Sequence, residues 1–212
     1  MSIFRDRDDA GEQLAGRLGA CFGADAVVLA LPRGGVPVAT ALAARIPAPL
    51  EVVVVRKLGV PGDPEYALGA IGEGGARVLD ADAMRSWGVA PADLAAVEER
   101  ERRELARRAR LFRRGRSHPD LTGREAVVVD DGIATGSTAM AACATARAFG
   151  AARVTVVAPV ASASALRRIG AVADRVLALE TPEPFGAVGR FYREFPQIAD
   201  DEVVEALERE SP

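Results

Sequence analysis

Two adjacent acids, Asp130 and Asp131, end a short apolar run in the middle of the chain, and a loop of small and hydroxylic residues follows them. The loop residues are Ala134, Thr135, Gly136, Ser137 and Thr138, and they lead into an alanine-rich helical pattern. Backbone N–H groups at a helix N-terminus can converge on one anion, and the helix dipole favours negative charge there. Two carboxylates would repel a phosphate unless they accept hydrogen bonds from hydroxyls of the same ligand. A sugar phosphate with vicinal hydroxyls meets both demands.

Two other loops carry positive charge. Arg33, Gly34 and Gly35 follow the first apolar run, and the glycines let backbone amides approach a ligand closely. Arg56 and Lys57 follow the second apolar run and are predicted to lie at the carboxyl end of a strand. Taken alone, the first loop also fits an ordinary tight turn between a strand and a helix.

The elements that must position these loops alternate along the chain. Short apolar runs predict strands near 26–31, 52–55, 126–129, 154–157 and 175–179, and helical patterns lie near 36–45, 92–114, 137–149 and 162–169. Strands that are apolar on both faces are typical of a parallel sheet with helices on both sides. We therefore predict an α/β fold with a doubly wound, mostly parallel five-stranded sheet. Ligands bind such sheets at the carboxyl ends of the strands.

Two further parts are expected beside the sheet. Residues 1–180 are predicted to form the core, which includes an insertion over about 69–116. The insertion holds a hairpin over 69–80, with its turn at 72–75, and an arginine-rich helix. Residues 181–212 are predicted to form a small C-terminal hood over the sheet.

Residues 126–138, AVVVDDGIATGST, resemble the motif with which type I phosphoribosyltransferases bind 5-phosphoribosyl diphosphate (PRPP). Gly132 departs from the pattern, because an apolar side chain is more usual there. The resemblance implies that Asp130 and Asp131 hold the ribose hydroxyls and that residues 134–138 hold the 5-phosphate. Enzymes of this family that act on 6-oxopurines usually carry an acid where this chain has Ala134, so a 6-oxopurine acceptor is disfavoured.

The basic loops resemble two other parts of the same family. Arg33, Gly34 and Gly35 resemble the loop that binds pyrophosphate, and residues 58–67, which the sequence predicts to be irregular, resemble a flexible loop that closes over PRPP. The resemblance implies that Lys57 contacts the pyrophosphate. Glu65 and Tyr66 are candidates for closing over it, although an ordinary surface loop fits equally well.

In the family the hood holds the base, often by stacking on an aromatic ring. Phe185 and Tyr192 are the candidates for this role, and the alternative is that these rings only anchor the hood to the sheet.

Composition limits the remaining roles. The 212 residues carry a net charge of −3 and no apolar stretch long enough to span a membrane, and the N-terminal residues are charged. We therefore expect a cytoplasmic protein with PRPP and a small-molecule base as partners, no membrane, and little affinity for nucleic acid. His118 is the only histidine, so we expect no metal bound directly by the protein. By the resemblance, Mg²⁺ is the cofactor and arrives on PRPP.

The segment 98–116 contains four acids and nine arginines. We interpret it as a solvated helix that packs on one side. A contact between copies in a homo-oligomer is an alternative, as is a nucleic-acid patch, which the net charge disfavours.

Three function classes remain. The first is a phosphoribosyltransferase, a pentosyl-transferring enzyme of nucleotide metabolism that releases pyrophosphate. The second is a regulator that senses PRPP on the same fold without chemistry and that is expected to carry a nucleic-acid-binding element, which we do not find. The third, a dinucleotide-dependent oxidoreductase, is disfavoured because Arg33-Gly34-Gly35 lacks the G-x-G-x-x-G spacing.

Overall fold

The structure is a computed structural model that describes residues 2–115 and 117–209. The strands are β1 (Ala26–Ala30), β2 (Leu50–Val52), β3 (Val55–Val60), β4 (Asp63–Gly72), β5 (Arg77–Leu79), β6 (Glu125–Val129), β7 (Arg153–Val160) and β8 (Arg175–Glu180). The α-helices are α1 (Arg7–Leu18), α2 (Gly35–Ala43), α3 (Ala81–Ser86), α4 (Pro91–Arg113), α5 (Ser137–Ala148), α6 (Ala163–Ile169) and α7 (Asp200–Arg209). Short 3₁₀ turns lie at Gly19–Cys21, Glu73–Gly75 and Val188–Phe191.

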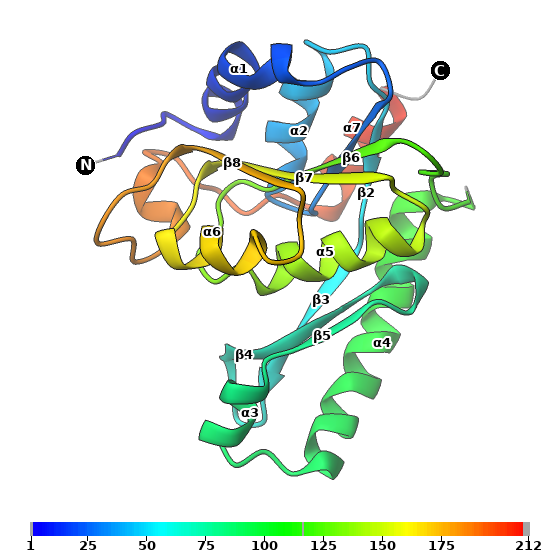
Figure 1. Ribbon diagram of the computed structural model, residues 1–212, viewed down its shortest axis with the longest axis vertical. Coiled ribbons are helices and arrows are strands. Elements are labelled where there is room, and N and C mark those ends of the chain that lie inside the picture. Colours follow the sequence, from blue (N-terminus) through cyan, green and yellow to red (C-terminus); the bar gives the residue numbers. More distant parts are fainter. Residues whose placement is uncertain (1, 116, 210–212) are drawn as a thin grey trace.

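Five parallel strands form the main sheet in the order β2-β1-β6-β7-β8. Helices α1 and α2 cover one face, and α5 and α6 cover the other (Figure 1). This arrangement confirms the predicted α/β fold. The sheet is buried because its strands are apolar on both sides: every residue of β1 and β6 is buried. Alternate β1 residues therefore enter two separate cores, with Val28 facing α2 and Val27 facing α5.

The order of the strands creates a topological switch point between β1 and β6. The chain leaves β1 toward β2 on one side of the sheet, while β6 lies on the other side of β1. The loops that follow β1 and β6 are therefore neighbours at the carboxyl edge, where open α/β sheets bind ligands. These are the loops that hold Arg33 and the two acids.

The structure corrects the second predicted strand and the loop after it. The predicted strand 52–55 is divided between β2, which ends at Val52, and β3, which begins at Val55 in a separate antiparallel sheet. Arg56 and Lys57 therefore lie inside β3 and not at the end of a main-sheet strand. The segment 58–67 is not irregular, because β3 and β4 form a hairpin that turns at Pro61 and Gly62. Gly62 has a φ of +85°, which suits this tight turn.

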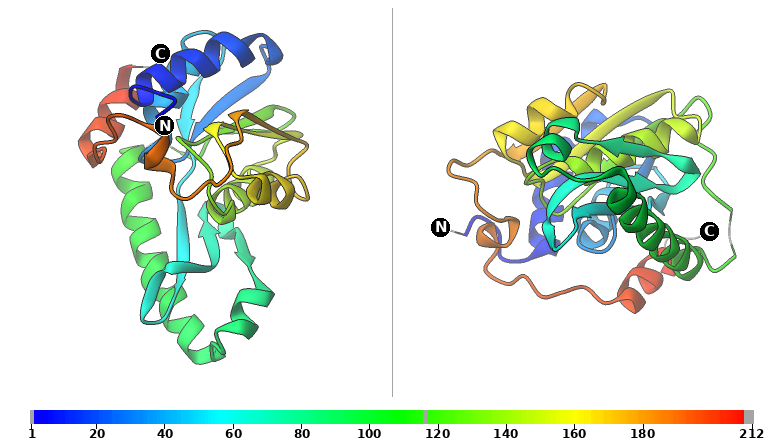
Figure 2. Two further views of the ribbon diagram at one scale, coloured as in Figure 1. Left: turned by 90° about the vertical axis from the view of Figure 1, so that its left-hand side faces the viewer. Right: turned by 90° about the horizontal axis from the view of Figure 1, so that it is seen from below.

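A projecting arm is built from β3, β4, β5, α3 and α4. It stands away from the main sheet beyond α5, as Figure 1 and the left view of Figure 2 show. The predicted hairpin over 69–80 is confirmed, since β4 pairs antiparallel with β5 across the turn at Glu73–Gly75. The insertion begins at Val55, however, and not near residue 69, because the first strand of the arm follows β2 after two residues.

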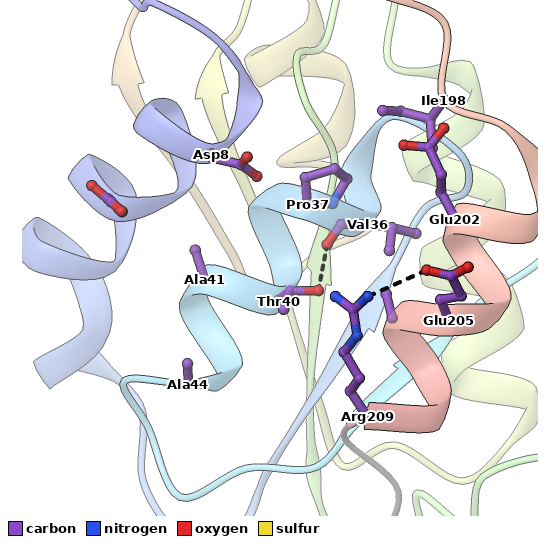
Figure 3. A pocket seen from close by; sticks show the side chains of 12 residues that line it. Asp8, Val36, Pro37, Thr40, Ala41, Ala44, Ile198, Glu202, Glu205 and Arg209 are labelled. Carbon is purple, nitrogen blue, oxygen red and sulfur yellow. Dashed lines mark hydrogen bonds and ion pairs between the residues drawn. The ribbon is translucent and has the colours of Figure 1, made fainter.

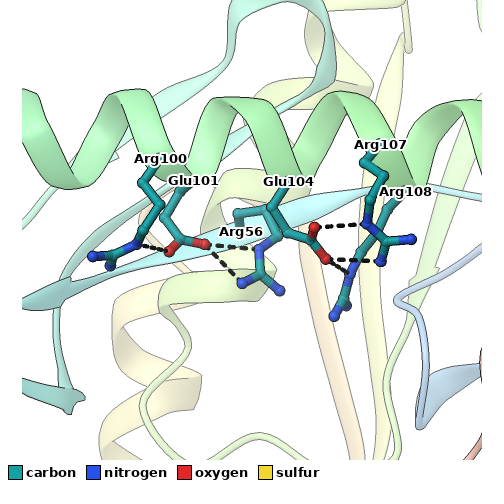
Figure 4. Close-up of polar contacts among 6 residues, drawn as sticks. All are labelled: Arg56, Arg100, Glu101, Glu104, Arg107 and Arg108. Atoms are coloured by element: carbon teal, nitrogen blue, oxygen red, sulfur yellow. Dashed lines mark hydrogen bonds and ion pairs between the residues drawn. The ribbon is translucent and has the colours of Figure 1, made fainter.

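Helix α4 has the one-sided packing that the sequence predicts. Its buried side includes Leu94, Val97, Leu105 and Phe112. Its arginines pair with acids of the same helix or with the arm, as Figure 4 shows around Glu104. Hydrogen bonds from Arg107 and Arg108 lower the pKa of Glu104 to about 2.

A buried ion pair joins the arm to the main sheet. Arg113, the last residue of α4, donates from Nε and Nη2 to the two carboxylate oxygens of Glu73, each at 2.8 Å. Glu73 also accepts the backbone N–H of Val54, between β2 and β3, at 3.0 Å. Both side chains are buried, at 7% and 3% exposure. One carboxylate thus fixes the end of α4 at the point where the chain leaves the main sheet.

Glu73→Ala should lower the free energy of unfolding by about 3 kcal/mol, because it leaves the Arg113 charge buried without its bidentate partner. The matched control is Glu99→Ala, which breaks a pair with Arg103 that is exposed on both sides and should cost less than about 1 kcal/mol. Urea denaturation of both variants measures the difference. Equal losses would show that the Glu73–Arg113 pair does not hold the arm.

Candidate functional site

The two acids lie at the carboxyl end of β6, as the sequence predicts. Asp130 accepts the backbone N–H of Asp131 at 2.9 Å, which holds its carboxylate beside its neighbour. Burial raises the pKa of Asp130 well above its usual range, and the nearby Asp131 charge raises it further. Burial also raises the pKa of Asp131, against the opposing effect of Arg7. The site therefore holds two acids whose negative charge is costly until positive or hydrogen-bonding groups reach them.

The loop after β1 lies directly against these acids. A Cβ atom placed on Gly34 would lie 2.0 Å from Asp131 Oδ2, and one on Gly35 would lie 2.5 Å from the carbonyl oxygen of Val129. Only glycine fits at either position without displacing the end of β6. The Pro32–Arg33 peptide bond is cis. The sequence predicted two separate loops, and the structure brings them into van der Waals contact.

The predicted phosphate loop lies at the N-terminus of α5. Gly136 precedes the helix with a φ of +82°, and no side chain of a described residue caps this helix end. The Ser162 hydroxyl donates to the carbonyl oxygen of Ala134 at 2.7 Å, which fixes the base of the loop. Thr135 is exposed, Thr138 is half-buried and Ser137 is buried. An uncapped helix N-terminus beside hydroxyl side chains is a suitable place for an anion.

The departure from the family pattern at Gly132 has a packing reason. A Cβ atom there would lie 2.4 Å from Val188 of the hood and 3.0 Å from Val160. The hood therefore approaches the backbone of the motif too closely for a side chain at this position.

Arg7, which the sequence analysis missed, contacts the site from the other end of the chain. Its Nε donates to Asp131 Oδ2 at 2.8 Å and its Nη1 donates to the carbonyl oxygen of Pro196 at 2.7 Å. No local pattern singles out this residue among the many arginines. The detectable signal was Asp6, which caps α1 by accepting the backbone N–H of Asp9 at 2.8 Å and so marks the helix start.

The structure separates the two candidate base-stacking residues. Tyr192 is 5% exposed, contacts the rings of Phe4 and Phe195, and donates its hydroxyl to the carbonyl oxygen of Asp131 at 2.5 Å. These contacts favour the alternative that its ring anchors the hood, and little of the ring is exposed for stacking on a base. Phe185 is half-buried and packs against Phe191, with ring centroids 5.0 Å apart.

The basic side chains lie around the same edge with different partners. Arg33 forms an ion pair with Asp200, at the start of α7, at 3.5 Å. Arg56 donates to Glu101 of α4 at 2.7 Å, so it belongs to the arm. Lys57 is half-buried and neighbours Arg56 on β3, where successive side chains point to opposite faces. The contact with Glu101 gives Arg56 a packing role in the arm, and a role of Lys57 at the pyrophosphate stays a prediction.

Tyr66 is exposed on β4 and lies against Trp87, with ring centroids 5.0 Å apart. The side chain of Glu65, the other candidate for closing over a ligand, lies outside the described residues.

A groove of about 420 Å³ lies elsewhere, between α1, α2 and α7 (Figure 3). Its polar lining is mainly acidic, from Asp8, Glu12, Glu202 and Glu205. These carboxylates would repel an anionic ligand, so this groove does not compete with the strand ends as a phosphate site. Within the described part of the chain, no group of acids, histidines and cysteines is arranged to hold a metal ion, and no helix has both the length and the apolarity to cross a membrane.

The fold and the site together define an α/β protein with a carboxylate pair, a glycine turn and a helix N-terminus at one switch point. The model of the phosphoribosyl transferase domain matches residues 8–194, and the chain belongs to that family. A Mycobacterium tuberculosis protein named "Putative phosphoribosyl transferase", found in strains H37Rv and CDC 1551, is 54% identical over 209 residues. The match covers 99% of this chain and 47% of the relative, so the chain spans about half of its length.

Two solved structures share the fold. The protein TT1426 from Thermus thermophilus is 43% identical with a TM-score of 0.83, and the match covers 100% of both chains. A purine phosphoribosyltransferase from Pyrococcus horikoshii is 18% identical with a TM-score of 0.50, over 91% of this chain and 92% of that one, which supports the fold alone.

The raised pKa of Asp130 gives a prediction for stability. Because the folded-state pKa lies above the unfolded value, the stability that this carboxyl contributes is present at acid pH and is lost as the pH rises through the folded pKa. Asp130→Asn removes the charge, so it should be more stable than the wild type at pH 7.5, and the difference should disappear near pH 4. A gain of about 1 kcal/mol corresponds to a rise in Tm of about 2–4 °C for a domain of this size.

Thermal denaturation at both pH values tests this, with Asp93→Asn as the control; Asp93 is an exposed acid in the first turn of α4, where its charge is favourable, so this variant should not raise Tm at pH 7.5. A Tm for Asp130→Asn below that of the wild type at pH 7.5 would contradict the prediction.

Proposed function

We propose that this protein is a phosphoribosyltransferase that transfers the 5-phosphoribosyl group from Mg-PRPP to a nitrogenous base or related acceptor and releases pyrophosphate. The observation that carries the proposal is the contact between Gly34 and Asp131. It puts the glycine turn after β1 against the acid pair after β6, and the loop that carries the acids leads into the N-terminus of α5. A ligand that bears a phosphate, vicinal hydroxyls and a diphosphate fits these three features together.

The acids and the α5 loop would hold the ribose 5-phosphate part of PRPP. Asp130 and Asp131 would accept hydrogen bonds from the ribose hydroxyls, and the backbone of residues 134–138 would bind the 5-phosphate at the helix N-terminus. Because burial makes the charge of both acids costly, hydroxyl donors from the ligand would offset part of that cost.

The pyrophosphate would leave toward the loop after β1. The amides of Gly34 and Gly35, the guanidinium of Arg33 and the ammonium of Lys57 would stabilise the negative charge that grows as the bond at ribose C1 breaks. The end of β2 runs beside that of β1, where Val53 donates its N–H to the carbonyl oxygen of Ala30 at 3.0 Å. Lys57 lies four residues after Val53, on β3, and β3 leaves the main sheet at this same edge.

Magnesium would reach the site on the diphosphate of PRPP, where it would neutralise negative charge. The protein itself would not hold the ion, because Asp130 and Asp131 would be occupied by the ribose hydroxyls, and the described residues contain no group of acids, histidines and cysteines arranged to hold a metal. The acceptor would lie under the hood near Phe185, and Ala134, which lacks a carboxyl group, disfavours a 6-oxopurine.

Binding of PRPP is the first test. Asp131→Asn should weaken PRPP binding by roughly tenfold or more, because each lost hydrogen bond to a charged acceptor costs about 1.5–3 kcal/mol. Isothermal titration calorimetry with Mg-PRPP measures the change, and Asp93→Asn on the arm is the control with unchanged affinity. Unchanged affinity in the folded double variant Asp130→Asn, Asp131→Asn would refute the proposed site.

Turnover is the second test, with pyrophosphate release measured for a panel of bases. Lys57 is the only lysine among the 27 basic residues of the chain. Its charge is expected to interact most strongly in the transition state, so Lys57→Ala should lower kcat by about 100-fold and raise the PRPP dissociation constant only a few-fold. Lys57→Arg, which keeps the charge, should recover part of kcat.

Two outcomes would contradict this role. Weaker PRPP binding with near-normal kcat in Lys57→Ala would mean that Lys57 only neutralises the bound diphosphate. Tight PRPP binding by the wild type without pyrophosphate release for any base would favour a PRPP-sensing regulator on the same fold.

A further inference from the structure

We propose that Arg7 is a positioning residue that fixes the ionised carboxylate of Asp131 for the ribose and couples it to the hood. This inference rests on the proposed function, because the ligand it concerns is PRPP. The family match begins at residue 8, so Arg7 lies just outside it.

The geometry around Arg7 is specific. Its guanidinium is held by three contacts: Nε donates to Asp131 Oδ2 at 2.8 Å, Nη1 donates to the carbonyl oxygen of Pro196 at 2.7 Å, and the group lies 3.7 Å from the ring centroid of Phe195. The Arg7 side chain is 8% exposed and that of Asp131 is 13% exposed. The planar guanidinium contacts three partners in different directions, so it has little freedom to move. A lysine ammonium at this position could not make the same set of contacts.

The contact leaves a defined acceptor for a ligand. Asp131 Oδ2 lies between Arg7 and the backbone of Gly34. Arg7 donates to Asp131 Oδ2 and the Asp131 N–H donates to Asp130 Oδ1, so neither of these bonds uses Asp131 Oδ1 or Asp130 Oδ2. Arg7 thereby occupies Asp131 Oδ2, so a ribose hydroxyl would donate to the other oxygen, Oδ1.

Charge balance gives Arg7 a second effect on the same acid. The charged and titratable groups that face Asp131 are Asp130, Arg7 and Tyr192. Arg7 lowers the pKa of Asp131 through its hydrogen bond and its charge, and burial opposes it. Burial raises the pKa of Tyr192, and the two acids raise it further, so its hydroxyl stays protonated and keeps donating to the Asp131 carbonyl. Arg7 is therefore the positive group that opposes the effect of burial and favours the ionised form of Asp131.

The link to the hood follows from the other two contacts. Pro196 and Phe195 belong to the segment that follows the 3₁₀ turn Val188–Phe191, and Tyr192 of the same segment bonds to Asp131. A displacement of this part of the hood would move Arg7, and through it the carboxylate. Base-binding and ribose-binding parts of the site are thus joined at one side chain.

The experiment compares the wild type with Arg7→Gln and Arg7→Lys, and with Arg17→Gln as the matched control. Arg17 lies on the same helix in an exposed pair with Glu180. Side-chain carboxyl ¹³C NMR of the ligand-free protein follows the titration of Asp131, assigned with Asp131→Asn, and calorimetry follows PRPP binding from pH 5 to 8.

In Arg7→Gln we expect the Asp131 titration to move to higher pH, because the charged carboxylate loses its positive partner. PRPP affinity at pH 7 should fall roughly tenfold or more, and its loss on acidification should begin at a higher pH than in the wild type. Arg7→Lys should show the same changes at smaller size, and Arg17→Gln should show neither.

An unchanged Asp131 titration in folded Arg7→Gln would overturn the proposal, and a purely structural role for Arg7 predicts that result. If Arg7→Gln does not fold, Arg7→Lys decides: an unchanged titration together with less than threefold loss of PRPP affinity would overturn it. If the wild type binds no PRPP, the proposed function fails, while the titration still decides whether Arg7 positions Asp131.

Discussion

Two adjacent carboxylates at the end of a buried strand are the constraint on which the rest of the site depends. Burial opposes the charge of both acids, and the charge of Asp131 further opposes that of Asp130, so the pair needs compensating groups around it. Gly34 leaves room for Asp131 by having no Cβ, Arg7 supplies positive charge, and the Asp131 N–H bonds to Asp130. A ligand with hydroxyl donors would complete this set, which is how the electrostatics of the protein relate to the chemistry proposed for it.

The arm depends on a different compensation. Glu73 and Arg113 form a buried ion pair with bidentate geometry at the junction between the arm and the main sheet. A buried ion pair contributes little net stability compared with apolar side chains of similar size. Burying either partner without the other is costly, however, so the pair favours the one arrangement of the arm and the main sheet in which both partners meet. That arrangement sets the course of β3 and therefore the position of Lys57. The exposed arginines of α4 are mostly paired within the helix, which leaves less positive charge for a nucleic acid than their number suggests.

The hood joins the two ends of the described chain. Phe4 pairs as an isolated bridge with Tyr192, and their rings lie 5.4 Å apart. Arg7 extends the same junction to Asp131. The aromatic residues of the hood thus divide into those that anchor it, such as Tyr192, and those nearer the surface, such as Phe185. Arg7, which lies on the N-terminal segment far from the motif in the sequence, thus completes the surroundings of Asp131, the acid proposed to bind ribose.

The sequence by itself determined the sheet, four of its five strands, the helices that follow β1, β6 and β7, and the acid pair with the small-residue loop that is proposed to bind phosphate. These features are local: a buried strand is an apolar run, and a phosphate loop is a contiguous set of small residues at a helix start. Only the tertiary structure decided the rest. It divided 52–55 between two sheets, because the partner of a short strand is chosen by packing and not by its own residues. It also paired Arg7 with Asp131 and Arg113 with Glu73, and it buried Tyr192. In a chain with this many arginines, the sequence cannot show which of them meets a given acid, since that choice depends on how distant segments pack around the sheet.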